Sequence, residues 1–442
     1  MANTYLSKTF SSAGSLTTWT WSGWVKRANL TGANQFLFSG GVSDQSGLHF
    51  DANEQLVHRY NTSFVSLQTS QVFRDTNAWY HIVAVYDSTN ATSSDRMILY
   101  VNGSRVTDFV AETYPAQNTD GRVNTSTSHV IGNESYTGYR FPFDGSMAHV
   151  HFIDGTAYDA SAFGEFDANG VWKAKTSPSV TYGTNGFFIL KDSASVTDQS
   201  GNGNNFTVSS GTLTDTLDCP ANVFATINGV NKGPYFAGTL SNGNLSHTGI
   251  TAGNYYTPGS TLRASSGKYY AEFKCQSTTN WTYVGIDTRN LTAANDWIGK
   301  TASGWSYLGG SSSGGSNSLM HNNSQTSYGD SYATNDIIGI ALDLDNKKLY
   351  FHKNGTYQNS GVPTSGATGT GAIDISTIGD DVYFGASNWS GSFTSGWDYN
   401  FGNGYFGTTA VASAGTNASG IGIFEYDVPT GYTALSTKGL NS

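Results

Sequence analysis

Two short stretches of the chain decide its fold class: WYHIVAVYD at residues 79–87 and MILYVNGSRV at residues 97–106. The first is rich in β-branched and aromatic residues and ends in an acidic residue, and the second has a central Leu-Tyr pair followed by Asn-Gly. The same pattern recurs at residues 337–345 (IIGIALDLD) and 348–356 (KLYFHKNGT). Asn-Gly tolerates the positive φ angles of tight hairpin turns, whose twist matches that of the flanking strands. Two copies in separate halves of the chain therefore predict two β-sandwich domains of similar construction.

The amino-acid composition supports an all-β chain. Charged residues make up 12% of the 442 residues, which leaves little material for solvent-facing helices, and aromatic residues make up 14% and suit pleated surfaces. A chain of this length holds about two to four domains, and two is the natural count for large sandwiches. We place them at residues 1–217 and 218–407, with the boundary close to Pro220, and interpret residues 408–442 as a linker and C-terminal tail.

The charge pattern argues against two classes of partner. The formal net charge is -10 and no run of Lys or Arg occurs, so the chain lacks the electrostatic attraction that nucleic acid or an anionic membrane requires. No stretch approaches the roughly 18 apolar residues of a membrane-spanning helix, so we expect no membrane insertion. Residues 1–24 lack a basic segment followed by an apolar run, so we expect no secretory signal peptide.

The first predicted domain opens with an alternating stretch, TWTWSGWVKR at residues 18–27, which puts two Trp and a Val on one face of a strand. Together with the first hairpin and the strand that ends in FIDG at residues 152–155, this stretch resembles the laminin-G-like, or concanavalin A-like, jelly roll. The resemblance covers roughly residues 1–160. We assign residues 157–217 to the same domain as a closing extension.

The second predicted domain resembles a SPRY domain, which is also a concanavalin A-like sandwich. The resemblance rests on GKYYAEF at residues 267–273, VGID at 284–287, LYFHKNG at 349–355 and YNFG at 399–402, and it spans most of residues 236–407. The two resemblances together imply an all-β protein with two concanavalin A-like (jelly-roll) antiparallel β-sandwich domains in tandem.

A laminin-G-like half followed by a SPRY-like half, joined through NVFATIN at residues 222–228, resembles structural proteins of tailed bacteriophages. This resemblance implies a protein on the surface of the virion, in a tail fibre, tail tip or capsid fibre, that is made in the host cytoplasm. Its expected partners are a host surface polysaccharide or protein, other virion proteins and further copies of the same chain. The apolar Ile423, Phe424 and Tyr426 of the tail are candidates for docking on such a partner. A purely architectural decoration protein of the capsid or tail is the alternative left open.

The sequence offers few catalytic candidates. Glycosidases on the sandwich fold need two carboxylates about 5 to 10 Å apart, commonly on one strand. The few Glu residues of this chain are scattered, and the nearest carboxylate pair, Glu165 with Asp167, is better interpreted as solvated loop charge. No nucleophile elbow, His-Glu-x-x-His pair or phosphate-binding Gly-Lys-Thr loop occurs in the sequence. We therefore expect a non-enzymatic protein, and a polysaccharide depolymerase would need carboxylates that converge from distant strands.

One loop has a weak resemblance to a calcium site. Asp198, Ser200 and Asn202 match the first positions of an oxygen-ligand calcium loop, but Ser209 stands where a bidentate Glu should close it. We favour an Asn-Gly turn whose side chains bond their own backbone, with no cofactor, and keep a calcium ion as the alternative.

Two further pairs of residues raise the question of a metal site or a disulfide. His149 and His151 share one strand face and have no evident third ligand, so we interpret them as packed or surface histidines. Cys219 and Cys275 are the two cysteines of the chain, and one lone pair is not a disulfide framework. We favour free thiols, with a disulfide between them as the alternative.

Aromatic residues in loop-like sequence are the candidate ligand-binding groups, because sugar rings stack on Trp and Tyr while polar loops bind the hydroxyl groups. The segment from Asn295 to Tyr307 is the preferred site, since it joins two predicted strands and carries aromatic, acidic and basic groups together. Packing in the core or at a sheet edge is the alternative for each aromatic candidate. The candidates are Trp297, Trp305, Tyr307, Tyr139 and Trp397.

Overall fold

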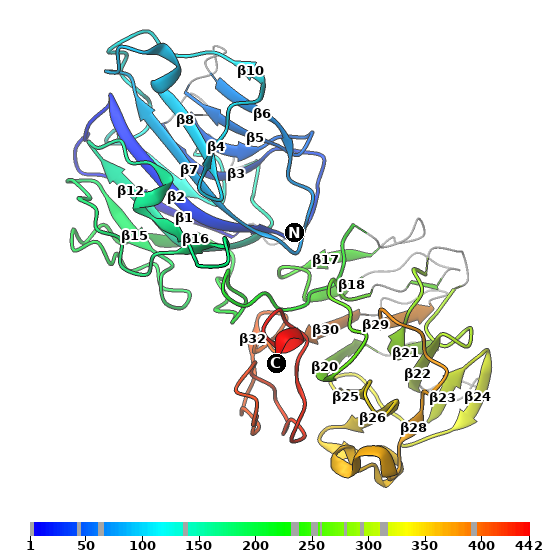
Figure 1. Cartoon of the computed structure of the whole chain (residues 1–442). Helices are drawn as coiled ribbons and strands as arrows, with labels where there is room; N and C mark the ends of the chain where they lie inside the picture. The colour runs from blue at the N-terminus through cyan, green and yellow to red at the C-terminus, as the bar shows by residue number, and fades with distance from the viewer. Residues whose placement is uncertain are drawn as a thin grey trace. The chain divides into compact units, whose positions relative to one another are not determined.

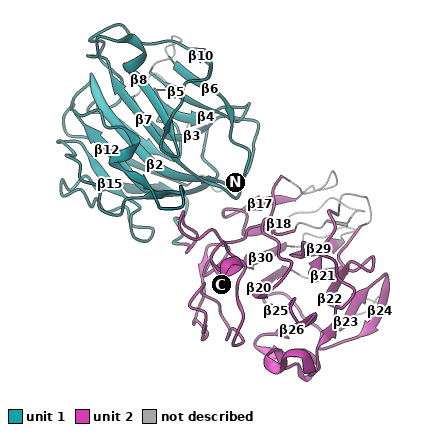
Figure 2. Ribbon diagram, viewed as in Figure 1, with its two compact units in different colours: residues 1–215 teal, residues 216–442 magenta. Residues whose placement is uncertain are grey.

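The computed structural model describes residues 4–41, 46–60, 66–135, 140–230, 238–248, 255–256, 259–277, 281–291, 296–309, 317–389 and 396–442. It divides into two compact units, Met1–Asp215 and Thr216–Ser442, so the division lies two residues before the predicted boundary (Figure 1, Figure 2). The described part of the chain is almost entirely strand and loop, and its helices are short 3-10 helices, namely η1 (Ser93–Asp95), η2 (Ala160–Ala162), η3 (Gln358–Ser360), η4 (Pro363–Thr368) and η5 (Gly439–Asn441). The all-β prediction is confirmed.

The first unit is built on two antiparallel sheets. The eight-stranded sheet has the order β10 (Phe109–Glu112), β6 (Ser66–Val72), β5 (Gln55–Arg59), β4 (Ser46–Phe50), β3 (Gln35–Gly40), β11 (Ser128–Ile131), β1 (Tyr5–Thr9) and β16 (Thr207–Ser210). The six-stranded sheet has the order β15 (Phe187–Ile189), β12 (Gly145–Asp154), β2 (Thr18–Arg27), β7 (Trp79–Asp87), β8 (Met97–Val101) and β9 (Ser104–Arg105). A separate hairpin is formed by β13 (Gly164–Phe166) and β14 (Trp172–Ala174).

The two sheets of the first unit enclose an aromatic core. Trp21 of β2 stacks on Phe38 of β3, with 6.3 Å between ring centroids, and Phe38 also contacts Phe152 of β12 at 5.6 Å. Trp19 and Val25 lie in the same core cluster as Trp21, which confirms the alternation predicted for the opening strand. Each large apolar side chain that is fully buried in this way stabilises the fold by about 2 to 3 kcal/mol.

The second unit is also a two-sheet sandwich. Its larger sheet has the order β17 (Thr239–Ser241), β18 (Ser246–Thr248), β30 (Gly396–Asn400), β20 (Lys268–Ser277), β25 (Ile337–Asp343), β26 (Lys348–Lys353) and β27 (Thr356–Tyr357), with β28 (Ile373–Asp374) beside β26 and β33 (Thr433–Ala434) beside β20. Its six-stranded sheet has the order β19 (Tyr255–Tyr256), β29 (Tyr383–Trp389), β21 (Trp281–Asp287), β22 (Gly304–Gly309), β23 (Ser318–His321) and β24 (Ser324–Ser327). The pairing is antiparallel except between β20 and β33, and β31 (Tyr405–Phe406) pairs with β32 (Thr409–Ala410) in a small hairpin.

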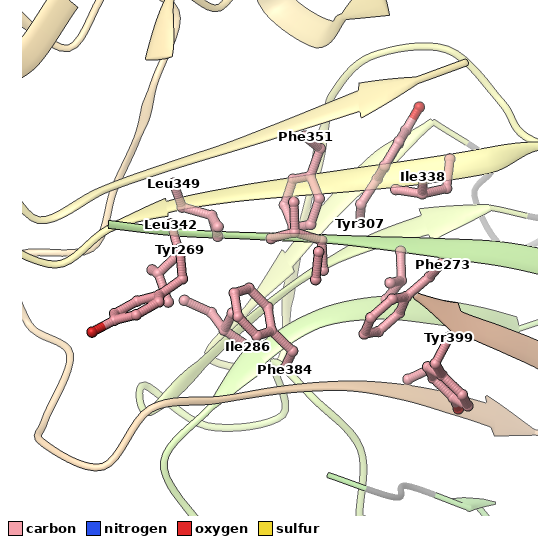
Figure 3. Close-up of a cluster of buried hydrophobic side chains, with 14 of the residues drawn as sticks. Tyr269, Phe273, Ile286, Tyr307, Ile338, Leu342, Leu349, Phe351, Phe384 and Tyr399 are labelled. Atoms are coloured by element: carbon pink, nitrogen blue, oxygen red, sulfur yellow. The ribbon is translucent and has the colours of Figure 1, made fainter. Parts of the chain in front are cut away.

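Figure 3 shows the core of the second unit, where side chains from the two sheets face one another. Phe273 and Ile338 come from the larger sheet, and Ile286 and Phe384 come from the six-stranded sheet. All four are essentially inaccessible to solvent. Every second residue of each strand therefore points inward, and the residues between them form the outer faces of the sandwich.

The two Asn-Gly turns are built in the same way. Asn102 and Gly103 have φ angles of 48° and 84°, and Asn354 and Gly355 have φ angles of 47° and 84°. Asn102 accepts a hydrogen bond from the backbone N–H of His81 through Oδ1, and Asn354 accepts one from Ile337, both at 2.8 Å. Asn also tolerates a positive φ better than other residues with a side chain, so one residue type satisfies both requirements of the turn.

Residues 408–442 are not the separate linker and tail that the sequence predicts. They belong to the second unit, where Phe424, Val428 and Tyr432 are buried against Tyr270 and Tyr350 on the outer face of the larger sheet. The prediction that Phe424 is available to a partner is therefore wrong, because its ring covers a sheet of its own chain.

The two cysteines are not bonded to each other. Cys219 and Cys275 are both free thiols, which confirms the favoured reading, and burial raises the pKa of Cys275 to about 12. Among the described residues, no helix is long and apolar enough to cross a bilayer.

Candidate functional site

The candidate site lies on the outer face of the six-stranded sheet of the second unit, which is the surface opposite the core. In β21, Val284 and Ile286 point into the core, so Trp281, Tyr283 and Asp287 belong to the outer face. Residues directly opposite each other in an antiparallel pair share a face. Tyr283 is opposite Leu308 and Ser387, and Asp287 is opposite Tyr383, so these side chains extend the outer face across the sheet.

Three aromatic rings form a stacked line at one end of this face, which we call the aromatic row. Trp281 and Tyr283 are 6.3 Å apart at an interplanar angle of 12°, and Tyr283 and Trp297 are 6.4 Å apart at 25°. Tyr283 is buried at the centre of the row, whereas Trp281 and Trp297 are each partly exposed. The ammonium group of Lys300 lies 4.9 Å from the centre of the Trp297 ring. The residues at both ends of the row are therefore partly accessible to solvent.

A loop that crosses the outer face holds Trp297 in place. The backbone N–H of Ile298 donates to Ser387 Oγ at 3.0 Å, and Ser306 Oγ donates to the Ile298 carbonyl at 2.7 Å. Ile298 itself is fully buried. Because both bonds anchor the loop to two different strands, Trp297 is fixed on the sheet and does not depend on its own packing alone.

On the other side of this loop, Arg289 joins two carboxylates. Its guanidinium lies 3.2 Å from Asp287 and 3.2 Å from Asp296, and its Nε donates to Ser303 at 2.7 Å. Partial burial by itself lowers the pKa of Arg289, but the two carboxylates outweigh burial, and the net pKa is raised. Asp287 and Asp296 are thus engaged in holding the loop.

Next to Arg289 is a small polar pocket that is open to solvent. Arg263 lies over the ring of Tyr383, with its guanidinium carbon 4.9 Å from the ring centre. It donates to the Thr288 carbonyl at 3.3 Å and to Asn290 Oδ1 at 2.5 Å. Burial raises the pKa of Tyr383 above its usual range, so Tyr383 stays a neutral phenol. The pocket is lined by Asn228, Gly259, Ser260, Arg263, Arg289, Asn290, Leu291 and Tyr383.

Of the five aromatic residues predicted from sequence, Trp297 lies at this site and Tyr139 lies outside the described residues. The other three are in the core, so the expectation that they offer a ring to a ligand is wrong. Trp305 is 3% exposed and stacks on His321 at 4.1 Å, and Tyr307 is fully buried with its hydroxyl donating to the Asp330 carbonyl (Figure 3).

Strand periodicity explains why these three residues are buried. Trp305 and Tyr307 are two positions apart on β22, and both point inward, although the sequence places them in a loop-like segment. Trp397 lies on β30, is 0% exposed and donates through Nε1 to Asn388 Oδ1 at 3.1 Å.

Sequence reasoning missed Trp281, Tyr283, Arg263 and Tyr383. A signal for the first two exists, because Trp281 and Tyr283 alternate with the apolar Val284 and Ile286 of the same strand and so share the opposite face. Arg263 and Tyr383 lie far apart in the sequence, and no local pattern connects them.

The loop with weak resemblance to a calcium site is an internal turn. The carboxylate of Asp198 accepts hydrogen bonds from the backbone N–H groups of Phe188, Ser200 and Asn204 at 2.8 to 2.9 Å, and from the Ser200 hydroxyl at 2.8 Å. Asn202 donates to the carbonyls of Gly183 and Gly186. Hydrogen-bond donors therefore surround the carboxylate where a cation would bind, and the side chains bond nearby backbone groups as predicted for a turn.

The paired histidines also have a packing role. His151 stacks on Phe188 at 3.9 Å, and its Nδ1 lies 3.0 Å from the Tyr182 hydroxyl. Burial lowers the pKa of His151 well below its usual value. Within the described ranges, no three His, Cys, Asp or Glu side chains gather in a group that could hold a metal ion.

Asp167 is likewise tied to its own turn. Its carboxylate accepts from the backbone N–H groups of Asn169 and Val171, both at 2.9 Å, and lies 2.5 Å from Lys173. Its pKa is lowered, first by the hydrogen bond from Lys173. These bonds give Asp167 a local structural role in the β13–β14 hairpin.

Comparison with known proteins identifies both units. Residues 3–160 match the family model described as the concanavalin A-like lectin/glucanases superfamily, and residues 268–373 match the model of the SPRY domain. The chain carries a concanavalin A-like domain and a SPRY domain. These two families have the sandwich folds described above, and both are compatible with a binding role.

Solved structures similar to the chain include two human SPRY domains. The SPRY domain of human HERC1 is 20% identical, covering 37% of this chain and 91% of its own, with a TM-score of 0.29. Another human SPRY domain is 12% identical, covering 35% of this chain and 90% of its own, with a TM-score of 0.28. Stonustoxin is 13% identical, covering 60% of this chain and 34% of its own, with a TM-score of 0.30. No curated protein sequence matches the chain.

Proposed function

We propose that the chain is a non-enzymatic structural protein of a tailed-bacteriophage virion that binds a glycan or protein on the host cell surface during adsorption. Its place in the virion is a tail fibre, tail tip or capsid fibre. The bacteriophage setting rests on the resemblance of the whole arrangement, a concanavalin A-like domain followed by a SPRY domain, to phage structural proteins. The binding role rests on the outer face of the SPRY domain.

The aromatic row is the observation that carries the binding role. Partly exposed Trp281 and Trp297 lie at its ends, and the buried Tyr283 fixes the spacing between them. Flat, rigid rings bind the C–H faces of sugars at little cost in conformational entropy, and nearby polar groups orient the ligand. Both kinds of group lie on one sheet face here, which favours a glycan as the ligand.

The first test is binding of the purified full-length chain to intact candidate host cells. Extracted surface polysaccharide is the competitor, and reducing ends are assayed in the same tubes. Saturable binding that the polysaccharide abolishes, without release of reducing ends, supports the proposal. Absence of binding favours an architectural decoration protein, and release of reducing ends favours a depolymerase.

Removing either exposed ring of the row is expected to weaken this binding. We expect Trp297→Ala and Trp281→Ala each to lower the affinity for host cells about tenfold, because an aromatic contact at the centre of a site contributes about 1 to 2 kcal/mol. Phe166→Ala is the matched control, since Phe166 is 57% exposed in the first unit and lies outside the site. Equal losses in all three variants, at unchanged thermal stability, would contradict the assignment of the site.

A further inference from the structure

The pocket beside the aromatic row has an unusual charge distribution. Two guanidinium groups, those of Arg263 and Arg289, line it, and no carboxylate is among its lining residues. The carboxylates of Asp287 and Asp296 are paired with Arg289 and are not among the lining residues. Arg263 has no such counter-charge, because in the described part of the chain its bonds go to a carbonyl and an amide oxygen, which are neutral. Arg263 is therefore the free positive charge of the pocket.

The geometry of Arg263 is already set for a planar anion. Tyr383 supports one side of its guanidinium at 4.9 Å, and Thr288 and Asn290 fix its orientation. An oriented guanidinium presents parallel N–H donors that match the two oxygens of a carboxylate, with less entropy lost on binding than for a mobile side chain. The Asn290 amide lies beside it, and since its oxygen accepts from Arg263, its nitrogen is a further donor at the pocket.

The size of the pocket restricts what can enter. It is shallow and open to solvent, and it is far smaller than the sites of about 300 to 1,000 Å³ that enclose a whole small molecule. The pocket thus fits one functional group at the edge of a larger ligand. The rest of that ligand must lie on the surface next to the pocket.

The aromatic row is that neighbouring surface. Tyr383, in the pocket, is opposite Asp287 on β21, and Trp281, at the far end of the row, is six residues away on the same strand. At 3.3 Å per residue the two ends are about 20 Å apart, a length that an extended chain of several sugars covers. The loop between them places Asp296 toward Arg289 and Trp297 in the row.

We propose that the glycan bound by this face is an acidic polysaccharide, with a uronate-type carboxylate on Arg263 and neighbouring sugar rings on the aromatic row. This inference rests on the proposed function and specifies its ligand class. A polysaccharide fits better than an acidic peptide because its ring faces and its carboxylates recur along one chain. The protein has a net charge of -10, so the contact depends on local geometry and receives no help from long-range attraction.

The test measures binding of the full-length chain to oligomers of galacturonate, glucuronate and mannuronate by calorimetry, each as the free acid and as its methyl ester. We expect at least one free acid to bind tenfold or more tightly than its ester. Arg263→Gln should remove this preference while leaving affinity for the ester unchanged, and Arg263→Lys should keep part of it. Trp297→Ala should weaken both forms by the same factor. Lys438→Gln is the control, since Lys438 is exposed at the other end of the same unit's sequence.

Failure of this inference is distinguishable from failure of the proposed function. No acid preference in any of the three pairs, or a preference that survives in Arg263→Gln, would overturn the acidic ligand while cell binding through Trp297 still stands. Equal competition by an acidic hexapeptide would overturn the polysaccharide in favour of a protein ligand. An Arg263-dependent acid preference without any binding to host cells would support the pocket and contradict the adsorption role.

Discussion

The two units have the same turn and differ in what covers it. In each, a Cβ added to the turn glycine would clash with an aromatic ring, 2.5 Å from Trp172 at Gly103 and 2.7 Å from Tyr426 at Gly355. Trp172 comes from the β13–β14 hairpin, which lies between β12 and β15 in the chain, and Tyr426 comes from the segment between β32 and β33. Each sandwich therefore uses a segment that connects two of its strands to cover the outer face of a sheet, and Gly is needed at the point of contact.

The segment that carries Trp172 and the segment that carries Tyr426, which we call the two covers, are held by different chemical groups. Trp172 donates through Nε1 to His81 at 3.0 Å, so neutral groups hold the cover of the first unit. In the second unit Glu272 accepts hydrogen bonds from the backbone N–H groups of Glu425 and Tyr426, both at 2.8 Å, and one from the Tyr270 hydroxyl at 2.9 Å. Burial raises the pKa of Glu272 to about 7. Only the second cover is thus held by a group that titrates near neutral pH.

Histidine use separates the units further. Six of the nine histidines are in the first unit, and five of these are almost completely buried, namely His49, His58, His81, His129 and His151. They pack in the same way as aromatic rings. For example, His49 stacks on Phe36 with 4.5 Å between the ring centroids. Burial lowers the pKa of His49, His58 and His81 to about 3, and that of His129 to about 4. Two sandwiches of one fold class therefore differ in how strongly acid is expected to destabilise them.

The largest expected effect is acid unfolding of the first unit ahead of the second. Unfolded histidines bind protons below about pH 6.5, whereas the buried ones stay neutral, so their contribution to stability is complete above that pH and is lost as the pH falls toward 4. Five such groups change the free energy of unfolding by at most about 7 kcal/mol per pH unit, which is comparable to the whole stability of a domain. In the second unit, Glu272 partly offsets the buried His247 and His352.

Calorimetric melting from pH 7.5 to 4.5 should therefore show the transition of residues 1–215 falling steeply while the other falls little. His58→Phe should reduce that slope by one proton, since neither ring nitrogen of His58 has a hydrogen-bond partner within the described residues. Two transitions that shift equally with pH would contradict the expected difference in acid stability between the two units.

An intermediate effect is expected from Glu272→Gln. Because the folded pKa of Glu272 is about 7 and its unfolded value is near 4.5, its contribution to stability is present at low pH and is lost as the pH rises through 7. The variant should flatten this decline of the second unit, which runs between about pH 4.5 and 7. It should also weaken the cover by about 1 to 3 kcal/mol, because an amide offers one acceptor where the carboxylate offered two.

Hydrogen exchange of residues 424–434 measures the loosening of this cover, and thermal melting measures the pH slope. Asp380→Asn is the matched control, since Asp380 is an exposed carboxylate of the same unit. Unchanged exchange in Glu272→Gln would show that apolar packing alone holds the segment.

The smallest effect tests the shared turn. Asn102→Ala and Asn354→Ala should each cost about 1 to 2 kcal/mol, because each loses one side-chain acceptor and places a residue less suited to positive φ, while the further bond that Asn354 donates to Asp336 is exposed and adds little. The two values should agree within about 0.5 kcal/mol, a difference typical of independent sites. Denaturant unfolding resolved by unit measures both, and Asn→Gly variants separate the φ requirement from the lost bond. A large difference between the two losses of unfolding free energy would mean that the turns share a backbone conformation but not the same stabilising interactions.

Local pattern was sufficient to predict many of the strands, the two Asn-Gly turns and the sandwich class. Alternation along residues 18–27 put Trp19 and Trp21 in the core, because a strand has a period of two whatever surrounds it. Residues 304–309 form the strand β22 although their sequence is loop-like, and for that reason the prediction that Trp305 and Tyr307 bind a ligand was wrong. Trp281, on the outer face of β21, was missed.

The sequence by itself determined that this chain forms two β-sandwiches, since turn chemistry and residue alternation act over a few neighbouring positions, and its resemblance to known families implied their concanavalin A-like class. Only the tertiary structure decided which aromatic residues reach solvent, which carboxylates pair with Arg289 and that Arg263 has no carboxylate partner among the described residues. It also decided that residues 408–442 cover a sheet rather than extend as a tail. The physical reason is that burial and charge pairing depend on residues brought together from distant parts of the chain, as Arg263 and Tyr383 are, and no local pattern encodes which residues those will be.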